Sequence, residues 1–108
     1  MSLISAHVLD AMVGVPAAGM KVTLAEETGE EIAAAVTDSD GRVGDLGPEK
    51  LPPGHYRVTF DTAAYFTSRG RDTFFPWVMV SFTVSEGEPH YHVPLLLSPY
   101  SYTTYRGS

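Results

Sequence analysis

Regularly spaced clusters of turn-forming residues confine this chain to short secondary-structure elements. Glycine, proline and acidic residues gather in VGVPAAG, EETGEE, TDSDGR, PEKLPPGH and SEGEPH, and most segments between them alternate apolar with polar residues. Such alternation predicts β-strands, because neighbouring side chains of a strand point to opposite faces. Short alternating strands separated by turns are typical of a sandwich or barrel of antiparallel strands.

The pattern predicts an all-β fold of about eight strands with one short helix. The predicted strands cover residues 3–10, 20–26, 31–37, 43–46, 55–61, 77–85, 90–97 and 100–106. The segment DTAAYFTSRG breaks the alternation, since Asp61 or Thr62 can cap the start of a helix and Gly70 can end it. We therefore expect a helix over residues 62–69.

Two segments indicate most clearly which side chains face the core. In MKVTLAE and in HYRVTF, every second residue is large and apolar, so these residues share one face of their strand. The six core candidates are Met20, Val22, Leu24, Tyr56, Val58 and Phe60.

Length and composition exclude several classes of function. A chain of 108 residues predicts a single domain over residues 1–108. It has no cysteine, which excludes disulfides and thiolate metal sites and fits a reducing compartment, so we expect a cytoplasmic protein. The formal net charge of -6 argues against a nucleic-acid partner. No stretch approaches the ~20 apolar residues that cross a membrane, so we expect no membrane partner.

Two predicted strands are apolar on both faces, which indicates an interface between subunits. They are YHVPLLL and FFPWVMVSFTV. A single sandwich of this size has only one core, so the second apolar face of such a strand needs another cover. We therefore expect an oligomer.

The histidines are the main candidates for chemistry. His90 and His92 share one face of their predicted strand, and His7 lies on the same face of the first strand as Ser5. If these strands approach one another, three imidazoles could converge, and they could also form a zinc site with an open position for water. The pattern fits a polar strand start equally well. Arg42 follows the turn DSDG, where an arginine is usually solvated.

Much of the chain resembles the transthyretin family. The resemblance is carried by HVLDAMVGVPAAGMKVTL from His7 to Leu24, by the TDSDGR turn, by the short helix and by the closing HYHVPLLLSPYSYTTYRGS. It implies a transthyretin-like, or prealbumin-like, β-sandwich of about eight antiparallel strands in two sheets with one short helix.

The two ends are similar to one branch of this family, the 5-hydroxyisourate hydrolases of urate breakdown. The hallmark of that branch is a C-terminal Tyr-Arg-Gly-Ser, which is here Tyr105 to Ser108. The hormone carriers of the family typically have lysine in place of His7 and lack an arginine at Arg42. The resemblance implies His7, Arg42, His92 and Ser108 as catalytic residues. It implies His7, Arg42 and Tyr105 as substrate-binding residues.

The implied reaction is the hydrolysis of 5-hydroxyisourate at its N1–C6 amide, giving 2-oxo-4-hydroxy-4-carboxy-5-ureidoimidazoline, without a metal or cofactor. His7 and His92 would orient and activate water, and Arg42 would stabilise the substrate and the oxyanion. The resemblance also implies a homotetramer, a dimer of dimers with sites at the dimer–dimer interface. Trp77 departs from the glutamate that relatives more often carry, which concerns packing rather than chemistry.

Three other functions remain open at this point. One is a transthyretin-like ligand carrier without turnover. Another is a zinc hydrolase using His7, His90 and His92. The third is a non-catalytic sandwich module, in which the histidines could be replaced without consequence.

Overall fold

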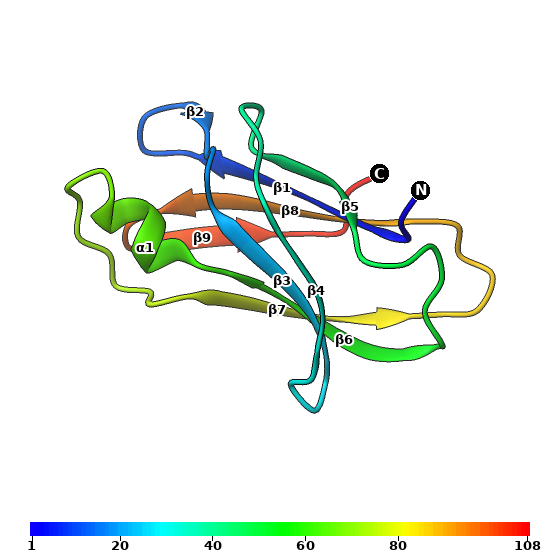
Figure 1. The fold of residues 1–108 in the computed structure, drawn as a ribbon. Coiled ribbons are helices and arrows are strands. Elements are labelled where there is room, and N and C mark those ends of the chain that lie inside the picture. Colours follow the sequence, from blue (N-terminus) through cyan, green and yellow to red (C-terminus); the bar gives the residue numbers. More distant parts are fainter.

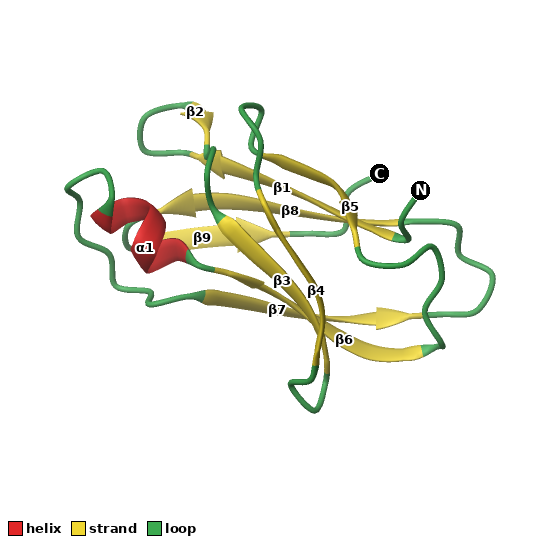
Figure 2. Cartoon of the chain, viewed as in Figure 1, coloured by secondary structure: helices red, strands yellow, loops and turns green.

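The computed structural model describes all 108 residues, which form a sandwich of two β-sheets with one helix at one end (Figures 1 and 2). The strands are β1 (Ile4–Asp10), β2 (Val15–Pro16), β3 (Lys21–Glu26), β4 (Glu31–Val36), β5 (Arg42–Leu46), β6 (Gly54–Phe60), β7 (Val78–Val84), β8 (Tyr91–Ser98) and β9 (Ser101–Thr104), and the helix is α1 (Thr62–Thr67). The predicted all-β class is confirmed. Only the two-residue strand β2 lies wholly outside the predicted segments, and β5, β6 and β8 each extend one residue beyond theirs.

Each of the two sheets contains strands from both halves of the chain. One sheet has the order β2-β1-β8-β9, with β5 paired to β1, and the other has the order β4-β3-β6-β7. Each pair in the second sheet is antiparallel, as expected. The pairing of β1 with β8 is parallel, so the prediction of antiparallel strands throughout is wrong for this pair. The parallel register sets Ser5 beside His92 and Ala6 beside Val93.

The core lies between the sheets and is made by the alternating residues. All six predicted core residues are buried, with Tyr56 the most exposed at 6%. On β8, Tyr91, Val93, Leu95 and Leu97 also face the core, which leaves His92 half-buried on the outer side. Alternation therefore keeps the histidine available for contacts outside the core.

The helix is two residues shorter than predicted. It begins at Thr62 after Asp61, whose side chain makes no capping hydrogen bond, and its C-cap is Ser68. Tyr65 and Phe66 bury their rings against the sandwich, so packing holds this single turn and a half in place. No helix is long and apolar enough to cross a membrane.

Candidate functional site

His7 and Arg42 are neighbours because β1 and β5 pair antiparallel in this register. The two residues are direct cross-strand partners, and His7 is half-buried while Arg42 is exposed. The Arg42 guanidinium makes no hydrogen bond or ion pair within the chain. A free guanidinium beside an imidazole is a donor available to a ligand.

The DSDG turn fixes the positions of both residues. Asp38 accepts hydrogen bonds from the backbone N–H groups of Asp40 and Arg42, at 2.9 and 3.0 Å. Gly41 has a φ of +74°, and a Cβ there would collide with the backbone carbonyl of Val8. The turn therefore needs glycine at this position, and it determines where β5 begins.

The same turn defines which nitrogen of His7 carries hydrogen. Nε2 of His7 lies 2.9 Å from the backbone carbonyl oxygen of Asp40. A carbonyl oxygen only accepts, so Nε2–H of His7 is the donor and Nδ1 keeps the lone pair of the neutral ring. Nδ1 makes no hydrogen bond within the chain and is free to accept a proton.

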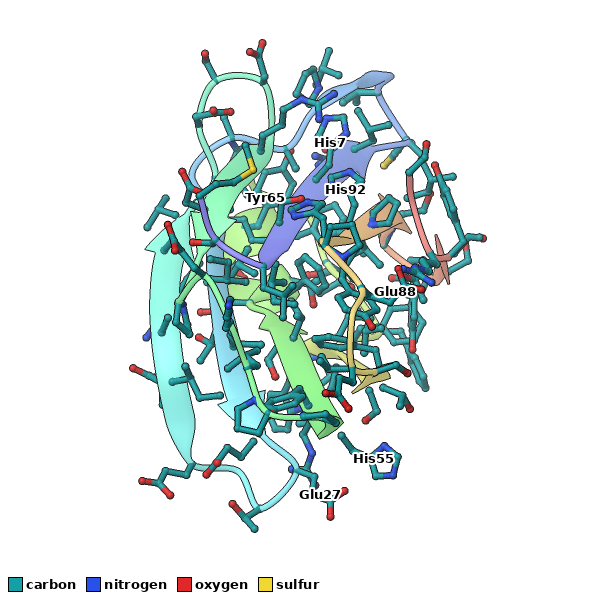
Figure 3. All side chains as sticks on the ribbon, turned by 90° about the vertical axis from the view of Figure 1, so that its right-hand side faces the viewer. His7, Glu27, His55, Tyr65, Glu88 and His92 are labelled. Atoms are coloured by element: carbon teal, nitrogen blue, oxygen red, sulfur yellow. The ribbon has the colours of Figure 1, made fainter.

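The parallel pairing of β1 with β8 brings His92 to the same place. The rings of His7 and His92 have centroids 6.4 Å apart, and Figure 3 shows the two side chains close together at one end of the molecule. His55 lies at the opposite end in the same view, away from this pair. A convergence of His7, Arg42 and His92 thus follows from strand register alone.

Ser5 and His90 extend this cluster behind His92. Oγ of Ser5 lies 2.7 Å from Nδ1 of His92 and 2.8 Å from Nε2 of His90. Sequence reasoning placed Ser5 on the His7 face but gave it no part. The parallel register, which sets Ser5 beside His92, is the signal that would have identified it.

The C-terminus is held against β8 by backbone pairing. The N–H of Gly107 donates to the carbonyl of His92 at 2.9 Å. Arg106 adds an ion pair with Glu88 at 3.4 Å and lies over the Tyr91 ring at 4.6 Å. These contacts carry Ser108 to the site.

An open pocket of about 630 Å³ lies beside the cluster. Its lining includes Ser5, Arg42, His90, His92 and Ser108. His7 is adjacent to this pocket through Arg42 and His92 rather than part of its wall. The pocket is lined by both apolar and polar groups, including the free guanidinium of Arg42 and the imidazole of His92. This lining suits a small polar molecule with carbonyl groups.

Tyr105 lines a second pocket of about 310 Å³ instead. Phe82, Tyr91 and Arg106 line it as well, and His92 is the residue that both pockets share. Within one chain, the structure therefore brings Arg42, His92 and Ser108 together and places Tyr105 on the other side of His92.

The surroundings of His92 favour its neutral form. Burial lowers the pKa of His92 below its ordinary value, and the positive charge of Arg42 lowers it further, with smaller effects from His7 and His90. A neutral imidazole can exchange protons with a substrate or water near neutral pH.

The histidines are not arranged as metal ligands. No group of three or more histidine, aspartate or glutamate side chains in the structure could hold a metal ion. Nε2 of His90 and Nδ1 of His92 both face Oγ of Ser5, so a serine hydroxyl occupies the point that these two nitrogens share. The geometry therefore gives the zinc arrangement of His7, His90 and His92 no support.

Comparisons with known proteins agree with the fold. The model of the HIUase/Transthyretin family matches residues 4–107. The 5-hydroxyisourate hydrolase of Salmonella dublin is 48% identical over 111 residues, covering 99% of this chain and 82% of that protein. The structure of the Klebsiella pneumoniae 5-hydroxyisourate hydrolase gives a TM-score of 0.91 at 38% identity, covering 99% of this chain and 100% of that one.

A transthyretin with bound thyroxine is about as similar in structure as this hydrolase. Sea bream transthyretin in complex with thyroxine gives a TM-score of 0.90 at 39% identity, covering 97% of this chain and 94% of that one. The fold therefore does not separate turnover from carriage, and the side chains of the site have to do so.

Proposed function

The chain belongs to the HIUase/Transthyretin family, and we propose that it is a hydrolase that opens the ring of 5-hydroxyisourate. The observation that carries the proposal is the convergence of His7, Arg42 and His92 beside a pocket that Ser108 also lines. Imidazoles and a guanidinium supply the two functions that amide hydrolysis needs, which are proton transfer and stabilisation of an oxyanion.

In the proposed reaction, His7 and His92 orient and activate a water molecule. The water adds to the carbonyl carbon of the N1–C6 amide, the C–N bond then breaks, and the ring nitrogen receives a proton. A positioned imidazole accelerates such a step by about 10²- to 10⁴-fold. The lowered pKa of His92 supports this role, because it keeps the ring neutral at pH 7.

Arg42 takes the part of the oxyanion stabiliser in this proposal. Its guanidinium stays charged and offers a planar fork of donors to the oxygens of the substrate. The absence of an internal partner for this group supports the role, since nothing in the chain competes for its hydrogens.

Ser108 closes the pocket in the proposal, through its hydroxyl and its terminal carboxylate. Its place in the pocket lining, together with Arg42 and His92, supports this assignment. Tyr105 would contact substrate only across a completed assembly, because within one chain it lies in the neighbouring pocket.

A homotetramer, a dimer of dimers, completes the proposed site at the dimer–dimer interface. Support comes from large apolar side chains left exposed near the edge strands β7 and β9. These are Phe74, Trp77, Met79, Tyr100, Tyr102 and Tyr105. Exposed apolar residues gathered in this way are typical of protein interfaces.

The carrier is the second candidate, and the similarity to sea bream transthyretin favours it. It would bind an aromatic ligand without turnover. The polar cluster argues against it, because a carrier has no need for a free guanidinium beside two imidazoles. The 48% identity to a protein named as the hydrolase points the same way.

The proposal is tested by producing 5-hydroxyisourate in the assay with urate oxidase and following its absorbance. The intact chain should consume the compound faster than its spontaneous decay. His7→Ala, Arg42→Ala, His92→Ala and a chain extended beyond Ser108 should approach the spontaneous rate while keeping their assembly. His55→Ala, at the far end of the molecule, should be fully active. Spontaneous decay with the intact chain would exclude the hydrolase.

A further inference from the structure

The hydroxyl of Ser5 lies between two imidazoles in a nearly closed environment. Ser5 is 8% exposed, and its Oγ lies 2.7 Å from Nδ1 of His92 and 2.8 Å from Nε2 of His90. Both distances are ordinary for hydrogen bonds. The three side chains therefore form one connected chain of hydrogen bonds behind His92.

A serine hydroxyl has a single hydrogen, so this chain can run in only one direction at a time. If Ser5 donates to His92, it must accept from Nε2–H of His90, and the hydrogen of His92 is then on its own Nε2. If Ser5 donates to His90, the hydrogen of His92 is on Nδ1. The direction of the chain thus decides which nitrogen of His92 is left bare.

The far nitrogen of His90 distinguishes the two directions. Nδ1 of His90 is buried and has no hydrogen-bond partner. A hydrogen on this atom would be a buried donor without an acceptor, and such orphaned N–H groups are rarer and costlier than an unpaired lone pair. The hydrogen of His90 therefore belongs on Nε2, where Ser5 accepts it.

We propose that Ser5 and His90 are positioning residues for His92. The chain runs from Nε2–H of His90 to Oγ of Ser5, and from the Ser5 hydroxyl to Nδ1 of His92. It holds the ring orientation of His92 and makes Nε2–H the group that His92 presents outward. Nε2 of His92 makes no hydrogen bond within the chain and is not buried, so it remains available to a ligand.

The arrangement divides the work between the two histidines, and this step rests on the proposed hydrolase function. Nδ1 of His7 has the lone pair, because Nε2–H of His7 donates to the carbonyl of Asp40. His7 takes a proton from water while the hydroxide adds to the amide carbon, and the same proton passes to the ring nitrogen when the C–N bond breaks. His92 keeps its hydrogen throughout and donates a hydrogen bond to the developing oxyanion beside Arg42.

The charged groups around the cluster are compatible with a neutral His92. Arg42, Asp45 and Ser108 line the same pocket as His90 and His92, and the positive charge of Arg42 disfavours a second proton on His92. The guanidinium of Arg106 donates a hydrogen bond to the backbone carbonyl of His90 at 3.5 Å, and its charge is paired with Glu88. Because His92 donates a hydrogen bond without transferring its proton, its ring does not have to be reprotonated during the reaction.

Nuclear magnetic resonance of protein with ¹⁵N-labelled histidine tests the assignment directly. Long-range proton–nitrogen correlations reveal which ring nitrogen carries hydrogen, and the signals are assigned by single His→Gln variants. We expect His7, His90 and His92 all to carry hydrogen on Nε2 at pH 7.5. A hydrogen on Nδ1 of His92 would overturn the proposal. The measurement needs no substrate, so its result stands whether or not the protein hydrolyses 5-hydroxyisourate.

Kinetics of three variants test the consequence for catalysis. Ser5→Ala and His90→Leu should each lower kcat by about tenfold with KM within about twofold, as expected for the loss of a group that holds a catalytic histidine. His90→Gln should keep a kcat within about threefold of the intact protein, because the glutamine amide can donate to Ser5 from the place of Nε2.

The matched controls lie outside the cluster. Ser85→Ala, directly after β7, and His55→Gln on β6 change the same residue types at exposed positions and should be fully active. Circular dichroism and size-exclusion chromatography establish that each variant is folded and assembled. A Ser5→Ala variant with an unchanged kcat, or a His90→Gln variant as impaired as His90→Leu, would contradict the proposal. An inactive intact protein with the expected tautomers would instead remove only the hydrolase function.

Discussion

Gly107 lies directly against the ring of His92. Its N–H donates to the carbonyl of His92 at 2.9 Å, and a Cβ at Gly107 would lie 2.5 Å from Cδ2 of His92 and 3.1 Å from Cγ of Pro94. The glycine of the C-terminal Tyr-Arg-Gly-Ser thus has a steric reason, since any side chain there would meet the imidazole of His92.

Gly107→Ala should therefore impair activity without unfolding the protein. The new methyl group has to displace the ring of His92 or the C-terminal strand, so we expect at least a tenfold loss of kcat/KM in the coupled assay. Gly87→Ala is the control for an added methyl group, because no atom lies within 4 Å of a Cβ there; its φ of +86° adds a backbone strain that Gly107 does not have, so the control is the stricter test of folding. Equal activity of the two variants would show that the contact between Gly107 and His92 is unimportant.

Arg42→Lys should be a poor replacement for arginine. Lysine keeps the positive charge but loses the planar fork of donors, so we expect kcat/KM to fall by about 10²-fold, the usual cost of one oxyanion donor. Steady-state kinetics on 5-hydroxyisourate measure the effect. Lys50→Arg, the reverse exchange at an exposed residue, should be neutral. Full activity of Arg42→Lys would show that charge alone suffices.

The titration of His92 should have its midpoint below the ordinary value of about 6.5. Burial and the charge of Arg42 lower the pKa of His92, so between the two values the unfolded chain binds more protons than the folded one. The free energy of unfolding contributed by this group should then decrease as the pH falls below about 6.5 and stay constant above it. Proton resonance shifts of His92 across pH 4–8 give the midpoint. A midpoint at or above 6.5 would be incompatible with this environment.

Activity should survive the removal of metal ions. The structure contains no group of three ligating side chains that could hold one. Dialysis against a strong chelator, followed by metal analysis and the coupled assay, should leave kcat unchanged. Loss of activity that zinc restores would favour the zinc hydrolase instead.

A buried ion pair at the far end of β1 should matter for stability rather than catalysis. Asp10 is fully buried and is paired with Arg71, while the Tyr65 hydroxyl also donates to it at 2.8 Å. Burial raises the pKa of Asp10, but the hydrogen bonds from Arg71 and Tyr65 outweigh it and hold the pKa below its usual value. The pair should therefore stabilise the fold above about pH 4 and lose this effect as the pH falls further.

Arg71→Met should lower the free energy of unfolding by about 3 kcal/mol at pH 7, because it leaves the Asp10 carboxylate buried without a charge partner. Denaturant unfolding at one fixed protein concentration measures the change. Lys50→Met removes an exposed, unpaired charge and should change stability by less than about 0.5 kcal/mol. If both variants unfold alike, the ion pair contributes nothing.

The fold was predictable from the sequence because alternation reflects burial directly. Met20, Val22 and Leu24 are buried as their spacing predicts, and the helix begins at Thr62 as expected. The parallel pairing of β1 with β8 was not predictable, because period-two alternation indicates a strand's faces but not its neighbour or direction.

The strand pairing, which alternation does not reveal, also limits what could be predicted of the site. The family resemblance implied roles for His7, Arg42, His92 and Ser108, and that inference did not require knowing which strands pair. The role of Ser5 depends on its lying opposite His92 in a parallel pair, and the separation of Tyr105 depends on which side of β8 the last residues pass. The role of Ser5 and the position of Tyr105 both depend on how the strands assemble into sheets, and a serine or a tyrosine in the sequence does not indicate that arrangement.

The pairing of β1 with β8 also determines when the site can form during folding. Ser5 and His92 are 87 residues apart in the chain, so their contact closes a loop of almost the whole molecule. Contacts between distant residues form slowly, because the entropy of a long loop has to be overcome before they are made. No partly folded form that lacks this pairing can have the histidine cluster. Regain of activity during refolding should therefore follow the slowest folding phase, and turnover itself becomes a probe of complete folding.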